Sequence, residues 1–163
     1  SPLRSLFLIA VVSIIMGLLL ILAELFGNQK RGLDDLRIRD GIAVGLGQAL
    51  ALIPGCSRSG STLTVAMLLG LNRADAARFS FMLGIPAVVL SGLLELVELY
   101  EIGLENVGVI GLIVGLITST IVSYVSIVWM IKFLERHSTW WFVAYRVLFG
   151  IVILLALNAK LIS

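Results

Sequence analysis

The chain has 163 residues, of which 60% are hydrophobic and only 13% are charged, so it is not an ordinary soluble domain. Its net charge of +2, with the basic residues in loops, gives no reason to expect a nucleic-acid partner. Its single cysteine, Cys56, excludes an internal disulfide. The composition therefore predicts an integral membrane protein.

The first predicted element is a membrane span at residues 1–26. Its apolar run of about 22 residues is long enough to cross roughly 30 Å of hydrocarbon. Glu24 lies at the far end of this run, where an interfacial position is more expected than a catalytic one. The chain begins at Ser1 without a methionine, and we expect further residues upstream.

A polar loop at residues 27–40 leads into two short apolar segments. These segments, residues 41–53 and 62–71, rise only 1.5 Å per residue as helices and are too short to cross a bilayer. We interpret residues 41–71 as a re-entrant helical hairpin with its tip near the membrane midplane. Irregular backbone at that depth is tolerated only when it is buried in protein or lines a wet cavity.

Small residues line one face of the first arm of this hairpin. Gly41, Gly45 and Ala49 recur at four-residue spacing, which allows another helix to approach closely. Gln48 lies on a neighbouring face and needs a polar partner at that depth. An interhelical hydrogen bond and a contact to a ligand are equally open interpretations of Gln48.

The turn between the two arms is the one polar run within otherwise apolar sequence. Pro54 stops a helix because it lacks an N–H and crowds the preceding turn. Gly55 and Gly60 let the backbone bend and approach a ligand closely. Between and just after these glycines lie one guanidinium and four hydroxyl groups, those of Arg58, Ser57, Ser59, Ser61 and Thr62.

These polar groups suit a phosphate. Ser61 and Thr62 stand about where the second arm begins, and a helix N-terminus offers unpaired N–H groups and the positive end of its dipole. Arg58 adds a planar fork of donors that matches phosphate oxygens. The alternative is a capped turn whose arginine pairs with a distant carboxylate, which we favour less because an arginine in the membrane is costly.

Three further spans are predicted, at residues 76–99, 107–131 and 140–160. Glu95, Glu98 and Glu101 recur near the end of the first; we favour a solvated rim for them over a metal site. Arg146 lies inside the last span and could snorkel outward. The middle span carries a stripe of small residues typical of helix packing, namely Gly111, Gly115, Ser119 and Ser123.

The basic residues predict the orientation of the chain. If the hairpin returns to the side it entered, the loops around residues 27–40, 72–78 and 132–139 share one face. That face then holds Lys30, Arg31, Arg37, Arg39, Arg73, Arg78, Lys132 and Arg136. The positive-inside rule makes it cytoplasmic. We therefore predict an all-α, multi-pass membrane protein with about four transmembrane helices and one re-entrant hairpin.

Residues 47–62, GQALALIPGCSRSGST, closely resemble the undecaprenyl pyrophosphate phosphatases of the bacitracin-resistance type. The resemblance continues through LGLNRADAARFSF at residues 69–81 and is strongest over residues 40–92. It implies hydrolysis of undecaprenyl diphosphate to the monophosphate, which recycles the lipid carrier for peptidoglycan synthesis in the bacterial plasma membrane. It also implies two inverted repeats whose re-entrant tips meet at the site.

On this resemblance, Arg58 binds the diphosphate and stabilises charge in phosphoryl transfer. Ser57, Ser59 and Thr62 hold the phosphate oxygens. The other family motif, a Glu/Gln-x-x-x-Glu run followed by a Ser-rich, His-containing hairpin, is not in this sequence, and Gln48 stands in the second repeat's counterpart of it. The base and the carboxylates for Mg²⁺ or Ca²⁺ are therefore expected outside this chain, which resembles the C-terminal part of such an enzyme and should be inactive alone.

A second interpretation comes from a different functional class. The same hairpin can serve as a midplane site for an anion or a lipid headgroup in an alternating-access transporter. Release of phosphate from a lipid diphosphate, as against movement of lipid without release, separates the two. The sequence leaves a homo-oligomer open.

Overall fold

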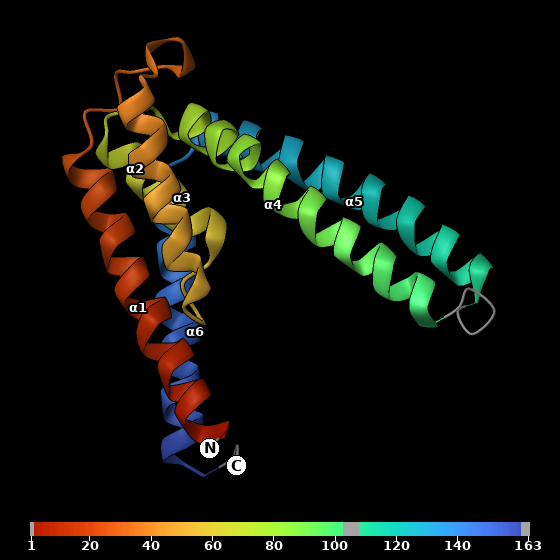
Figure 1. The fold of residues 1–163 in the computed structure, drawn as a ribbon. Coiled ribbons are helices and arrows are strands. Elements are labelled where there is room, and N and C mark those ends of the chain that lie inside the picture. Colours follow the sequence, from red (N-terminus) through yellow and green to blue (C-terminus); the bar gives the residue numbers. More distant parts are fainter. Residues whose placement is uncertain (1, 103–107, 161–163) are drawn as a thin grey trace.

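The computed structural model describes residues 2–102 and 108–160, and Figure 1 shows a helical chain with no extended sheet in that part. The elements in order are α1 (Pro2–Phe26), η1 (Leu33–Asp35), α2 (Ile38–Ala49), η2 (Leu50–Leu52), α3 (Arg58–Leu68), α4 (Arg73–Ile102), α5 (Val109–Arg136) and α6 (Trp140–Asn158).

Within the described residues, four helices are long and apolar enough to cross a membrane, namely α1, α4, α5 and α6. The predicted all-α, multi-pass fold is therefore confirmed. The start of the predicted 107–131 span falls partly outside the described residues. Helix α5 continues to Arg136, beyond residue 131 where we predicted the span to end, and it buries Leu134 against the bundle. Helix α4 runs through Pro86 without ending.

Helices α1 and α6 lie side by side along their lengths (Figure 1), and glycines set their distance. A Cβ added at Gly17 would lie 3.1 Å from Cγ2 of Val147, and one at Gly150 would lie 2.8 Å from the carbonyl oxygen of Ala10. Small residues let helix backbones approach this closely in membranes. The contact fixes the inward face of α6, which carries Arg146.

Helices α2 and α3 form a short pair packed beside α1. They have 12 and 11 residues, so each is only about 17–18 Å long. Gly47 of α2 admits Val65 of α3, whose Cγ2 would lie 2.8 Å from an added Cβ. The pair has the shape expected of the predicted hairpin, and its depth in a membrane remains a prediction.

Main-chain hydrogen bonds hold both ends of this pair together. The N–H of Arg31 donates to the carbonyl of Gly70 (3.0 Å), and the N–H of Asn72 donates to the carbonyl of Arg31 (2.9 Å). These bonds form an isolated bridge between Arg31 and Leu71. The segment that enters α2 and the segment that leaves α3 therefore lie at the same end of the molecule.

The buried core lies at that same end, where α1, α2 and α3 meet the first turns of α4 and α6 and the last turn of α5. Its largest fully buried side chains include Val44, Met67, Leu71 and Leu134. The rest of α4 and α5 extends away from the other helices as a separate arm (Figure 1). Among the described residues, the predicted packing stripes are unpartnered, since nothing lies within 4 Å of a Cβ added at Gly41, Gly45, Gly111 or Gly115.

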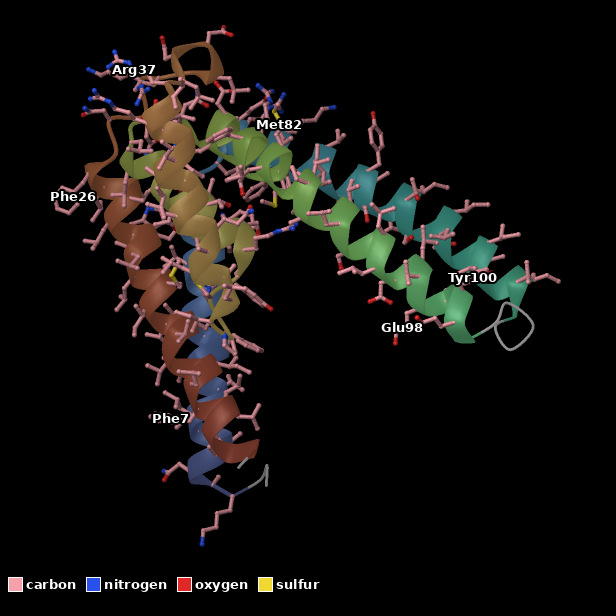
Figure 2. The ribbon with its side chains drawn as sticks, viewed as in Figure 1. Phe7, Phe26, Arg37, Met82, Glu98 and Tyr100 are labelled. Carbon is pink, nitrogen blue, oxygen red and sulfur yellow. The ribbon has the colours of Figure 1, made fainter. Side chains whose placement is uncertain are left out.

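Charged side chains join the elements at the core end. Glu24 of α1 accepts hydrogen bonds from Arg73 of α4 and, at 2.7 Å, from the hydroxyl of Thr139 before α6. In Figure 2 nitrogen-bearing side chains gather at this end around Arg37, whereas Glu98 lies far along α4. The basic end is thus the end predicted to face the cytoplasm.

Candidate phosphate-binding site

The turn that connects α2 to α3 adopts an unusual backbone. Gly55 has a φ of 89°, and a Cβ added there would lie 2.6 Å from the carbonyl oxygen of Ile9 in α1. Ser57 also has a positive φ, 63°, although it is not a glycine. A non-glycine residue in such a conformation persists only where its surroundings hold it, and it often marks a functional site.

Ser57 is the N-cap of α3. Its Oγ accepts a hydrogen bond from the N–H of Gly60 at 3.3 Å, and its carbonyl accepts one from the N–H of Ser61 at 3.0 Å. Helix α3 therefore begins at Arg58, earlier than the start that we predicted near Ser61 and Thr62. The physical reason is this cap, because a serine hydroxyl satisfies an N–H group that the first turn leaves unpaired.

The earlier start buries two hydroxyls that were predicted to bind a ligand. Both Ser61 and Thr62 have fully buried side chains. The Ser61 hydroxyl donates to the carbonyl of Arg58 at 2.9 Å. The Thr62 hydroxyl pairs with Ser80 of α4 and with the same carbonyl of Arg58. The structure thus brings these two hydroxyls into the helix packing rather than into a cavity.

The other polar residues of the turn line a cavity of about 440 Å³ between α1, α3 and α6. Ser57, Ser59 and Gly60 form its wall at the N-terminus of α3, together with Gly55. Ser13 of α1 and Arg146 of α6 face them from the other helices. This cavity combines a helix N-terminus, hydroxyl groups and a guanidinium, which are the groups that bind phosphate oxygens.

Arg58 does not share this cavity. Its Nη1 donates to the carbonyl of Gly84 in α4 at 3.4 Å, and its side chain lines a separate, mostly apolar groove of about 530 Å³ between α4 and α5. Gly84 makes room for the guanidinium, because an added Cβ would lie 3.0 Å from Nη2 of Arg58. The sequence predicted a single cluster of Arg58 with the serines, and the structure places them on different sides of α3.

From the sequence we expected that the side chain of Arg146 could snorkel outward, and this expectation is wrong. Its side chain turns inward, and the residue is only 9% exposed. Nη2 donates to the carbonyls of Gly55 and Cys56 at 2.8 and 2.9 Å. The close packing of α6 on α1 turns this face of α6 toward the tip of the pair. The sequence feature that could have indicated this inward position is an arginine within a predicted membrane span, because such residues usually face the interior of the protein.

Gln48 also lies where a polar partner is needed. Its Oε1 is buried and accepts no hydrogen bond from the described residues. The two interpretations of Gln48, a hydrogen bond to another helix and a contact to a ligand, both require an additional donor at this point.

A divalent cation such as Mg²⁺ or Ca²⁺ is held mainly by carboxylate and other oxygen ligands. The described residues contain no group of three or more His, Cys, Asp or Glu side chains placed to hold a metal ion. Glu95 and Glu98 line a groove between the outer parts of α4 and α5, away from the turn. The residues present here therefore do not fit a site for Mg²⁺ or Ca²⁺.

Curated relatives of this chain carry the name undecaprenyl-diphosphatase. The one from Parasynechococcus marenigrum is 55% identical over 154 residues, covering 94% of this chain and 53% of that protein. The one from a Synechocystis strain is 56% identical over 155 residues, covering 95% of this chain and 48% of that protein. The one from Trichodesmium erythraeum is 49% identical over the whole chain and 52% of its own length.

The chain spans about half the length of the curated relatives it matches. Residues 1–152 match the family described as bacitracin resistance protein BacA. That match covers nearly the whole chain, including the Pro54–Thr62 turn and the helices around it. The chain belongs to the BacA family.

Proposed function

We propose that this chain supplies the phosphate-binding part of an undecaprenyl-diphosphate phosphatase. In this reaction water attacks the terminal phosphorus, the P–O–P bond breaks, and undecaprenyl phosphate and inorganic phosphate leave. The observation that carries the proposal is the capped N-terminus of α3, where Ser57, Ser59 and Gly60 line a cavity together with Arg146. The similarity to relatives named undecaprenyl-diphosphatase supports it.

The described residues suit the binding of phosphate better than the activation of water. Hydrogen-bond donors and positive charge stabilise the negative charge that develops on phosphate oxygens during transfer. A general base needs a carboxylate or an imidazole within reach of the water. His137 stacks on Phe133 at the end of α5, and Glu24 is engaged with Arg73. We therefore assign the base, and the carboxylates for any Mg²⁺ or Ca²⁺, to residues outside this chain.

The same reasoning extends the proposal to partners and location. The lipid carrier diphosphate is the substrate, and a second repeat of the same protein completes the site. The protein lies in the bacterial plasma membrane, with the basic end of Figure 2 on the cytoplasmic side. Recycling of the carrier supports peptidoglycan synthesis and gives resistance to bacitracin.

The proposal can be tested by substituting Arg58 in the full-length protein that contains this chain. If Arg58 contacts the diphosphate, Arg58→Ala should lower phosphate release from undecaprenyl diphosphate by about 10²–10³-fold. Arg58→Lys should recover little of it, because an ammonium lacks the planar fork of the guanidinium. The measurement is phosphate release by purified protein in detergent and in liposomes.

The matched control is Arg39→Ala, which removes an exposed arginine of α2 far from the turn. This variant should retain normal phosphate release. Near-normal release by a well-folded Arg58→Ala protein would show that Arg58, which lies outside the cavity lined by Ser57 and Ser59, does not contact the diphosphate. Transfer of lipid across liposomes without any phosphate release by the wild-type protein would instead support the transporter interpretation.

A further inference from the structure

Arg146 is a buried cation without an anionic partner among the described residues. It is 9% exposed, and the four ion pairs of the described part of the chain all involve other arginines. A guanidinium taken out of water is costly unless a negative charge and hydrogen bonds compensate for it. The fold therefore retains a positive charge at this point for which the described residues supply no counter-charge.

The hydrogen bonds of Arg146 use only part of its guanidinium. Nη2 donates to the carbonyls of Gly55 and Cys56 at 2.8 and 2.9 Å. Nε is buried and donates to no acceptor in the described chain. Nη1 likewise has no hydrogen bond there, and it lies directly against Gly60, where a side chain would overlap it. Nη1, which lies against a residue of the cavity wall, thus remains available for an acceptor that the described residues do not provide.

Nη1 lies beside a helix N-terminus. The first hydrogen bond of α3 runs from the N–H of Ser61 to the carbonyl of Ser57 at 3.0 Å, so the N–H groups of Arg58 and Ser59 precede it. Such N–H groups attract anions. Ser57, Ser59, Gly60 and Arg146 all line the same cavity of about 440 Å³. The unpaired guanidinium and the helix end are independent features, and both select for an anion with several oxygens.

We propose that Arg146 is a second phosphate-binding residue, whose Nη1 donates to a phosphate oxygen of the lipid diphosphate at the N-terminus of α3. Nη2 holds the Gly55–Cys56 turn at the same time, so one side chain binds the ligand and positions the loop. This inference rests on the proposed phosphatase function and adds a residue to it. Arg146, rather than Arg58, is the cation that shares a cavity with Ser57 and Ser59.

The first experiment uses the full-length protein with Arg146→Lys. A lysine can still donate to the turn carbonyls but lacks the fork that reaches a second acceptor. We expect KM for undecaprenyl diphosphate to rise by about tenfold or more, with a smaller change in kcat. Inorganic pyrophosphate should raise the unfolding temperature of the wild type and no longer that of the variant. The control is Arg136→Lys at the exposed end of α5, which should leave both readouts unchanged.

A second variant tests the same contact without altering Arg146. In Gly60→Ala the added methyl group overlaps Nη1 and displaces the guanidinium from the end of α3. If both substitutions act on one contact, the double variant should have about the same KM as Arg146→Lys alone. Effects that multiply would show that Gly60 and Arg146 act separately, which would overturn the proposal.

The outcomes distinguish this inference from the proposed function. A wild-type protein that releases no phosphate and gains no stability from pyrophosphate would overturn both. The second outcome is a wild-type protein that releases phosphate and is stabilised by pyrophosphate. If the Arg146→Lys variant then shows the same KM and the same stabilisation, only the role of Arg146 is overturned. If Arg146→Lys does not fold, Gly60→Ala decides, and an unchanged KM there would overturn the proposal.

Discussion

Ser57 joins two functions in one residue, since it caps α3 and forms part of the cavity wall. Its φ of 63° is a conformation that a serine adopts at a cost of about 1–3 kcal/mol. The hydrogen bond from the N–H of Gly60 to its hydroxyl offsets part of that cost. The residue therefore carries local strain at the point where a ligand would meet the helix end.

Two substitutions at Ser57 separate the cap from the strain. Ser57→Ala removes the cap and keeps the strained backbone, so it should lower stability by about 1 kcal/mol. Ser57→Gly also removes the cap but relieves the strain, so its stability should stay close to that of the wild type. Both should reduce phosphate release. Thermal unfolding and phosphate-release assays check this, and an equal loss of stability in the two variants would contradict the role of the backbone.

Among individual residues, the sequence predicted some members of the candidate site and missed others. Pro54, Gly55 and the hydroxyl-rich turn were recognisable because prolines and glycines restrict or free the backbone locally. The inward turn of Arg146 was not predictable, because it depends on the packing of α6 against α1. The separation of Arg58 from Ser57 depends in the same way on the position of α4.

Between elements, the pair of Arg31 and Asp40 connects the loop after α1 to the start of α2. Hydrogen bonds from the Arg31 guanidinium hold the pKa of the Asp40 carboxyl below its usual value, and the N–H of Arg37 adds to this effect at 2.9 Å. A second nitrogen of Arg31 donates to the carbonyl of Leu69 at 2.8 Å. Asp40 in its charged form thus ties α2 to the end of α3.

This pair predicts a dependence of stability on pH. Because the pKa of Asp40 is lower in the folded state than in the unfolded state, its contribution is present at neutral pH and is lost as pH falls below about 4. Asp40→Asn should lower the unfolding temperature at neutral pH. The unfolding temperature of this variant should also decrease less than that of the wild type as the pH is lowered. Unfolding midpoints from about pH 7 to about pH 3 test this, and parallel pH curves for the two proteins would be the contrary result.

At the scale of elements, the sequence predicted the membrane-spanning helices better than the residues at which they end. Long apolar runs gave the four spans, because crossing a bilayer requires a minimum length. Lys132 and Arg136 suggested a loop, but helix α5 runs through both of them and buries Leu134 between them. Charge near a helix end marks the membrane surface rather than the last turn of the helix.

At the scale of the whole molecule, the loop after α1 and the loop after α3 meet at one end. Cysteines introduced at Asn28 and Asn72 in a Cys56→Ser background should therefore both react with a membrane-impermeant thiol reagent from the cytoplasmic side. Lys160→Cys, at the opposite end of α6, should react from the other side. Labelling of Asn28→Cys and Asn72→Cys from opposite sides would mean that residues 41–71 cross the membrane.

The sequence predicted least well which helices pack against each other. The stripe of Gly111 and Gly115 predicted a packed face, but within the described residues α5 presents this face to open space. A packing motif specifies that a close neighbour fits, without specifying which helix supplies it.

The bridge between Arg31 and Leu71 has a consequence for tolerance to mutation. Its two bonds run between peptide groups, so replacing a side chain does not remove them directly. Side chains reinforce the same junction, since Arg31 donates to the carbonyl of Leu69 and Asn72 donates to the carbonyl of Arg31. Proline is the exception, because at position 31 or 72 it would delete a donor N–H. A substitution here other than proline therefore weakens the junction only through the side-chain contacts that it removes, and leaves the bridge between the peptide groups in place.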